Sequence, residues 1–342
     1  MREGFKIFLG SLGFWIPQKW LIRASGQDRI FPFYHAVSDD PMPHVAHTYP
    51  VRSLKRFRKD LEFLLRHFEP VGLEELKLIE KPGKHKKPSM FLSFDDGLSE
   101  IYDMVAPELI SRGIPAGIFV NTDFIDNKEL FYRYKSSLLV DRFEIIKYAP
   151  AVTELLQSRY HLASSRKRCV KEFLLSISYK NKSELEEVAK LVELDFKTFL
   201  KVKQPYLTMQ QLKELRDQGF YIGSHSKDHP RFSEISPDER TTQYRESIEF
   251  LQKELEIDYG AFSFPFSDSG VPADFFRDLS SEGMPRIDAS FGTGGLKNDP
   301  VSFHKQRISM ESGKAPAGIL IRGEYLYFLL KGLFGKNEIS RS

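Results

Sequence analysis

The sequence predicts an α/β fold in which parallel strands form a barrel that a helical insertion interrupts. Short β-branched and aromatic strands alternate with amphipathic helices, and this order is typical of a parallel sheet with crossover helices. The segment at about 126–204 instead has helical patterns rich in Lys, Glu and Leu, with little strand character. About six or seven β/α units fit a barrel better than a doubly wound open sheet.

Length and composition favour one large folded unit. The chain has 342 residues, of which 41% are hydrophobic and 13% aromatic, so a sizeable packed core is available and global disorder is excluded. The charges nearly balance, with 50 Lys and Arg against 47 Asp and Glu. This balance argues against a dedicated nucleic-acid binder, so no nucleic-acid partner is expected.

The single cysteine, Cys169, excludes an internal disulfide and is compatible with a reducing compartment. Residues 5–16 come nearest to a secretory apolar segment, but Pro17, Gln18 and Lys19 follow and no cleavage site is visible. No stretch reaches the roughly 18 to 20 apolar residues that span a bilayer. We therefore expect a cytoplasmic protein.

Both ends of the chain are amphipathic and basic. The expected organisation is an N-terminal segment at 1–29, a catalytic domain at 30–318 that contains the insertion, and a C-terminal tail at 319–342. Such ends can lie in a membrane interface, which would make this a peripheral protein on the inner face of the membrane. They can equally pack on the barrel exterior, and periodicity does not separate these alternatives.

In the first half, residues 30–37 (IFPFYHAV) predict a strand and 38–50 a loop. Ser53 suits the N-cap of a helix over LKRFRKDLEFLLRHF, and a solvated loop is expected from Lys81. A strand at 90–94 (MFLSF), a helix that ends at Gly113 and a strand at 116–122 follow.

After the insertion the alternation resumes. Helices are expected in TMQQLKELRDQG, SPDERTTQYRESIEFLQKEL and VPADFFRDLSSEG, and strands in FYIGS and AFSF, with a last strand near VSFHKQRIS.

Three polar clusters each begin where a predicted strand ends. Asp95 and Asp96 follow MFLSF, the segment from His225 to His229 follows FYIGS, and Pro265 follows AFSF. The carboxyl ends of the strands form the catalytic face of parallel α/β folds, so the clusters can converge on one cleft.

The aspartate and histidine pairs together indicate a metal site. Alternation along a strand sends adjacent carboxylates in different directions, so Asp95 and Asp96 can perform different roles, although DDG alone is also an ordinary turn. His225 and His229 have the spacing of one helical face, but Pro230 makes a curled loop an equal alternative. Two imidazoles and one carboxylate suit zinc, with open positions for water and substrate.

SFDDG at 93–97, HSKDH at 225–229 and FSFPF at 262–266 resemble successive motifs of the polysaccharide deacetylase family, the NodB-homology group of carbohydrate esterases. The resemblance implies a distorted (β/α) barrel of that type. It also implies that Asp95 is the general base and that Asp96, His225 and His229 hold a divalent metal, usually zinc.

The sequence departs from this family in two places. The late leucine-rich motif reads GILIRGEYLYFLL and lacks the histidine that many members use as general acid. One branch, the poly-N-acetylglucosamine deacetylases, has an early Tyr-His pair that Tyr34 and His35 resemble, so we predict His35 as the general acid. The alternative is that His35 has only a structural role. His304 is the weaker candidate for the acid. Ser263 also stands where the family often has Arg, and Arg307 is the candidate replacement near Asp95.

Pro265, Phe266 and Arg307 are the candidate substrate-binding residues, the first two as a sugar-facing wall or simply a rigid strand-end turn. The main hypothesis is a zinc-dependent hydrolase that removes an N-acetyl group from a sugar of a polysaccharide, glycolipid or lipid-linked glycan. The alternatives are an amidase acting on a linear C–N bond of a non-sugar compound and a catalytically silent barrel that binds glycans. Nucleophile elbows and P-loops are missing from the sequence.

Overall fold

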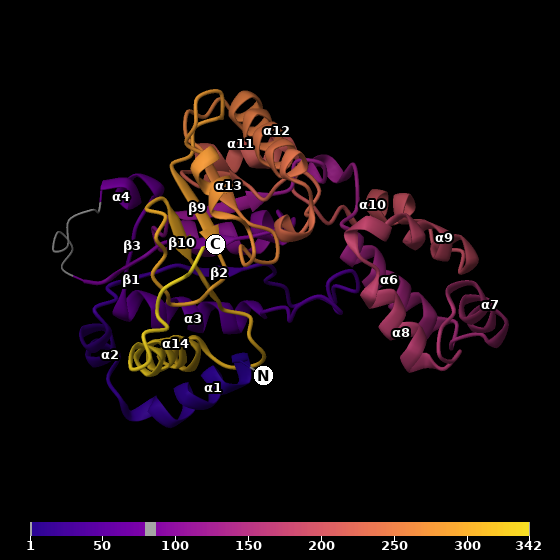
Figure 1. Cartoon of the computed structure of the whole chain (residues 1–342), viewed down its shortest axis with the longest axis horizontal. Helices are drawn as coiled ribbons and strands as arrows, with labels where there is room; N and C mark the ends of the chain where they lie inside the picture. Colours follow the sequence, from indigo (N-terminus) through magenta and orange to yellow (C-terminus); the bar gives the residue numbers. More distant parts are fainter. Residues whose placement is uncertain (1, 79–86, 342) are drawn as a thin grey trace.

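The computed structural model describes residues 2–78 and 87–341. A central barrel has helices around it, and a helical lobe projects from one side (Figure 1). The loop predicted from Lys81 lies largely outside the described residues.

Eight parallel strands form the main sheet, in the order β10-β9-β8-β7-β6-β5-β2-β11. Their bounds are Pro32–Tyr34 (β2), Leu92–Phe94 (β5), Ala116–Val120 (β6), Tyr221–Ser224 (β7), Ala261–Ser263 (β8), Ala289–Gly292 (β9), His304–Gln306 (β10) and Ile308–Ser309 (β11).

The two edge strands of this sheet, β10 and β11, are consecutive parts of one extended segment. Arg307, the residue between them, donates its backbone N–H to Gly292 O at 3.1 Å, while Ile308 N donates to Phe31 O at 2.8 Å. The same segment therefore pairs with β9 on one side and β2 on the other. This arrangement closes the sheet and confirms the predicted distorted parallel barrel.

Two predicted strands are each divided in the structure. The segment predicted at 30–37 overlaps β1 (Arg29–Ile30) and contains β2, and the segment predicted at 90–94 overlaps β4 (Ser89–Met90) and contains β5. The first parts join β3 (Glu69–Pro70) in a small sheet of order β1-β4-β3, whereas the second parts enter the barrel. Each of these two expected strands thus contributes to both sheets, a division that periodicity along the chain does not reveal.

The helices that cover the barrel include α3, which begins after the predicted N-cap: the Ser53 side chain accepts from Arg56 N. A π-helical turn at Ile101–Val105 leads into α5. The bounds of the surrounding helices are Leu54–His67 (α3), Leu73–Leu78 (α4), Ala106–Ile110 (α5), Met209–Asp217 (α11), Pro237–Leu255 (α12) and Ala273–Asp278 (α13). Apolar side chains from α3, α11 and α12 join those of β5, β6 and β7 in the largest buried cluster.

The lobe occupies the stretch that the sequence predicts to be helical. Its helices are Tyr132–Ile145 (α6), Pro150–Tyr160 (α7), Lys167–Ser176 (α8), Ser183–Leu191 (α9) and Phe196–Lys203 (α10). They share a second apolar cluster, which also contains Ala36, Val45 and Leu98 from loops beside the barrel. The lobe is therefore packed onto the carboxyl ends of β2 and β5, where the predicted catalytic residues lie.

The N-terminal and C-terminal helices pack together on the barrel exterior (Figure 1). Helices α1 (Arg2–Leu12) and α2 (Gln18–Ser25) lie against α14 (Ala317–Gly332), which covers α3. Gly10 and Gly323 permit close contact of α1 with α14, because a Cβ on Gly10 would lie 2.0 Å from Ile319 O. In the part of the chain that the structure describes, none of the helices is both long and apolar enough to cross a membrane.

One barrel strand, β9, was not expected from the sequence. It comprises only the four residues ASFG, none of which is β-branched. Tertiary pairing with β8 and β10 supplies what local propensity does not.

Candidate active site

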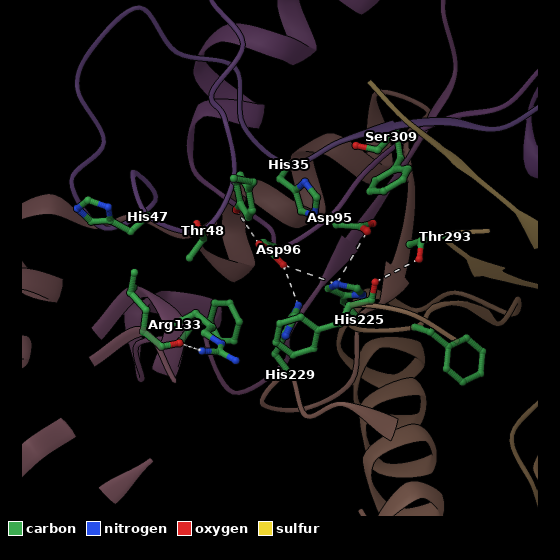
Figure 2. Close-up of a pocket in the computed structure, with 16 residues that line it drawn as sticks. His35, His47, Thr48, Asp95, Asp96, Arg133, His225, His229, Thr293 and Ser309 are labelled. Carbon is green, nitrogen blue, oxygen red and sulfur yellow. Dashed lines mark hydrogen bonds and ion pairs between the residues drawn. The ribbon is translucent and has the colours of Figure 1, made fainter. Parts of the chain in front are cut away.

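Asp96, His225 and His229 converge at the carboxyl ends of β5 and β7. Oδ1 of Asp96 lies 3.2 Å from Nε2 of His229 and 3.6 Å from Nε2 of His225. All three side chains are buried. Figure 2 shows both imidazoles directed at this carboxylate. Within the described residues they form a group whose ligand atoms lie within 4.8 Å of one another, so the predicted set is brought together.

The segment between the two histidines is a loop, which decides between the two conformations expected for HSKDH. Ser226 and His229 have positive φ angles of 71° and 65°, a conformation that side chains other than glycine adopt only when the surroundings support it. Here Ser226 N donates to Ser224 Oγ at 3.0 Å and His229 N donates to Ser226 Oγ at 3.1 Å. Asp228 points away and accepts from the Tyr179 hydroxyl of the lobe.

The donor atoms of this cluster fit a divalent cation such as zinc. Nδ1 of His225 lies 2.7 Å from Ser263 O, so it carries the proton and leaves Nε2 as a lone-pair donor. Burial, together with His229 and Arg307, lowers the pKa of His225 to about 4, against the opposing pull of Asp95. Asp96 Oδ1 is buried without a hydrogen-bond partner. A neutral imidazole and an unpartnered carboxylate oxygen are what a metal ligand set requires.

Two tyrosines hold the other oxygen of Asp96. The hydroxyl oxygens of Tyr49 and Tyr134 lie 2.7 and 2.8 Å from Oδ2 and also contact each other, so their two protons are shared among these three contacts. Tyr134 comes from α6 of the helical lobe. Burial alone would raise the pKa of Asp96, but His229, His35 and His225 lower it well below its usual range. The carboxylate is therefore ionised, with Oδ1 left facing the histidines.

Asp95 lies beside this cluster in a two-pronged ion pair with Arg307. Nη1 and Nη2 of Arg307 donate to Oδ1 and Oδ2 of Asp95 at 2.7 and 2.6 Å, and Nη2 also donates to Ser263 Oγ at 2.6 Å. Burial opposes ionisation, but Arg307 lowers the pKa of the Asp95 carboxyl. Arg307, in the segment that closes the barrel, thus supplies the positive charge that is absent at Ser263.

The predicted contact of Arg307 with substrate is not what the geometry supports. The guanidinium is fully buried, stacks on the Phe33 ring at 4.2 Å and lies behind Asp95 rather than on the pocket wall. Its place in the site is to hold Asp95, because the guanidinium is enclosed and does not line the pocket.

His35 follows β2 and enters the same pocket from its other side. Its Nδ1 lies 2.6 Å from Glu311 Oε2, while Glu311 Oε1 accepts from the backbone N–H groups of His35 and Ala36 at 2.9 Å each. The imidazole stacks on Tyr49 with the ring centroids 4.1 Å apart. Burial alone would lower the pKa of His35, but the Glu311 carboxylate raises it to about 9. His35 is therefore a protonated imidazolium at neutral pH.

These groups line a pocket of about 420 Å³, a size typical of small-ligand sites. Phe266 forms one wall and packs edge-on against His229, with centroids 4.6 Å apart. Pro265 is buried behind that wall and does not line the pocket, so of the predicted pair only Phe266 faces it. Phe131, just before α6, also lines the pocket and lies next to Phe266 and His229, with ring centroids 6.1 and 4.2 Å away. Arg133, at the start of α6, is a further lining residue (Figure 2).

His304, the weaker candidate acid, does not reach this pocket. It is buried, with Nδ1 2.6 Å from Ser290 Oγ and Nε2 3.1 Å from Asp268 Oδ2. Asp268, Asp299 and His304 form a second candidate metal group, but Arg341 already donates to both carboxylates. These contacts make a structural network away from the Asp96 cluster.

Sequence reasoning missed Glu311, Tyr49 and Tyr134. None of them stands in a motif or directly after a predicted strand. A signal existed only for Glu311, which comes two residues after the last predicted strand in ISMES.

The comparisons with known proteins agree with this geometry. A family model described as polysaccharide deacetylase matches residues 82–285. The deacetylase PplD of Streptococcus pyogenes, solved with acetate, has a TM-score of 0.51 and 16% identity, covering 85% of this chain and 96% of that one. A de-N-acetylase from Aggregatibacter actinomycetemcomitans has a TM-score of 0.51 and 14% identity, covering 85% and 98%. At such identities the likeness shows the fold alone. Among curated proteins there was no significant match.

Proposed function

The chain belongs to the polysaccharide deacetylase family, hydrolases that remove N-acetyl groups from glycans, and we propose that it acts with zinc on an N-acetylated sugar of a glycan or glycolipid. The observation that carries this proposal is the arrangement around Asp96. Its unpartnered oxygen and two imidazole nitrogens face one point, with Asp95 and His35 beside that point.

A divalent cation held by Asp96, His225 and His229 would supply a Lewis acid that polarises the acetyl carbonyl and makes water a stronger nucleophile. Asp95 then accepts the proton of the attacking water, since Arg307 keeps the carboxylate ionised and fixes its orientation. As the C–N bond breaks, His35 donates its proton to the leaving amine. The products are acetate and the free amino sugar.

His35 suits the role of general acid because Glu311 keeps it protonated and oriented. The assignment also accounts for the absence of histidine from the late leucine-rich segment. After transfer, the neutral imidazole would recover its proton from solvent, since its side chain remains partly exposed.

The aromatic walls fit a pyranose ring. Phe266, Phe131 and Tyr49 offer flat apolar surfaces to the C–H faces of a sugar, while Arg133 and Thr293 provide polar groups at the edge. This lining favours the glycan substrate over a linear amide of a non-sugar compound.

The test is acetate release from N-acetylglucosamine oligomers and from lipid-linked N-acetylated glycans, with chelator and with zinc added back. We expect release that chelator abolishes and zinc restores. Release only from linear non-sugar amides would identify an amidase. Zinc-loaded protein that releases no acetate from any substrate would instead indicate a glycan-binding role.

The cytoplasmic location stays a prediction from the sequence. Fractionation of cells, combined with a thiol reagent that does not cross membranes, tests it through Cys169, which is partly exposed. Labelling in intact cells would contradict the prediction.

A further inference from the structure

Helix α1 exposes large apolar side chains to solvent and buries a lysine. Side chains on one side of the helix, at Phe5, Phe8 and Leu12, follow the i, i+3, i+7 spacing of a helical stripe and are exposed to solvent. The opposite side carries Lys6 and Gly10, and both are buried against α14. A surface helix normally buries its apolar stripe, so this stripe has the composition of a face that contacts something apolar.

The inner side of α1 is held in place by polar and backbone contacts. Lys6 is paired with Glu324 of α14, and both side chains are buried. A Cβ on Gly323 would lie 2.2 Å from Lys6 O, so the two backbones are in close contact. Rotating α1 to bury its apolar stripe would break the ion pair and this contact. The outward direction of the stripe is therefore built into the packing.

The exposed apolar surface continues beyond α1. Among the described residues, ten of the fourteen large hydrophobic side chains that are exposed lie in residues 5–20 or 330–334. Trp15 is 85% exposed in the turn after α1, and Trp20 is 66% exposed on α2. We call the surface formed by Phe5, Phe8, Leu12, Phe14, Trp15 and Trp20 the terminal face. A concentration of this kind marks an interaction site.

Charge identifies the partner. Exposed Arg2, Lys19 and Arg23 accompany the terminal face, whereas the single acidic residue of the segment 2–25, Glu3, is hydrogen-bonded to Ser312 and paired with Lys6. Tryptophan and phenylalanine beside lysine and arginine are the composition of helices that lie in the headgroup region of anionic bilayers. We propose that the terminal face docks on an anionic lipid bilayer.

The first residues of α1, next to the terminal face, contact two loops that flank the active pocket. Arg2 donates to the backbone oxygen of Gly294 at 3.1 Å, and Gly294 follows Thr293 of the pocket wall. Ser312, which follows Glu311, donates to Glu3 at 2.9 Å. Docking through α1 would therefore bring the pocket beside the membrane surface. Resting on the proposed function, we infer that the natural substrate is a membrane-anchored glycan.

Both tryptophans of the chain lie on the terminal face, so their fluorescence reports docking directly. The probes are vesicles of phosphatidylcholine alone and vesicles that also contain phosphatidylglycerol. We expect a blue shift and quenching by brominated lipid with the anionic vesicles, weakened by salt.

The double variant Phe8→Ser, Leu12→Ser keeps both tryptophans and should bind anionic vesicles at least tenfold more weakly. The matched control Ile145→Ser, Val202→Ser removes two exposed apolar side chains from the lobe and should bind like the unaltered chain. Absence of a blue shift, or equal binding by both variants, would overturn the docking proposal. So would a dimer that the first variant dissociates, with no vesicle binding, because a second copy would then cover the face.

Acetate release separates docking from the reaction. The Phe8→Ser, Leu12→Ser variant should lose at least tenfold on a lipid-linked N-acetylated glycan in vesicles and keep its rate on soluble oligomers. Equal rates on both substrates would overturn the membrane-anchored substrate while leaving the deacetylase intact. Vesicle binding without acetate release from any substrate would overturn the proposed function and support docking alone.

Discussion

The carboxylate of Glu311 lies 2.6 Å from Nδ1 of His35 and also accepts the backbone N–H of the same residue. One side chain thus sets the charge of the imidazole, the direction of its free nitrogen and the position of the chain that carries it. This relationship gives the proposed general acid its physical basis, because a histidine of ordinary pKa would be mostly neutral at pH 7.

Replacing the acid tests the assignment directly. His35→Gln should lower kcat by about 10²–10⁴-fold while leaving the metal content unchanged, since His35 is not among the proposed ligands. Steady-state acetate release and metal analysis are the measurements. His161→Gln, at an exposed position in the lobe, is the control. An unchanged rate in the His35 variant would remove the general-acid role.

The pH dependence tests Glu311. Because the pKa of His35 is raised to about 9, the proton is present below that pH, and activity should decline as pH rises through it. Glu311→Gln keeps an acceptor for the backbone N–H groups but removes the negative charge, so the alkaline decline of kcat/KM should move to lower pH. An alkaline limb at the same pH in both proteins would show that another group is the acid.

The ion pair beneath the site makes Asp95 sensitive in two ways. Asp95→Asn should abolish turnover and retain zinc, since the base is lost and the ligands stay. It should also cost about 3–5 kcal/mol in the free energy of unfolding, because Arg307 remains buried without its counter-charge. Urea unfolding, metal analysis and acetate release separate these effects. His225→Ala, by contrast, should lose zinc and activity together.

The tyrosines on Asp96 should tune metal affinity. Tyr134→Phe removes one donor to Oδ2 and should weaken zinc binding by about 10–100-fold, as expected for a partner of a metal ligand. Competition with a chromophoric chelator measures this without reference to activity. Tyr148→Phe, whose hydroxyl lies elsewhere in the lobe, should bind zinc normally. Equal affinities would mean that Tyr134 serves packing only.

Much of the site could be predicted because a parallel fold turns sequence position into spatial position. Asp95 and His225 each follow a strand, and the carboxyl ends of neighbouring parallel strands share one edge. The same logic failed for Pro265, since a residue at a strand end can face inward or outward, and the turn there directs Phe266 to the pocket instead.

The sequence by itself determined the barrel class, the helical insertion, the pair of aspartates and the pair of histidines, because these depend on local periodicity and on which residues follow strands. Only the tertiary structure decided that Arg307 lies behind Asp95 and that Glu311 raises the pKa of His35. It also decided that Tyr134 reaches Asp96 from the lobe. These contacts join residues far apart in the chain. Their distances depend on how the barrel closes and how the lobe packs upon it, which no local pattern encodes.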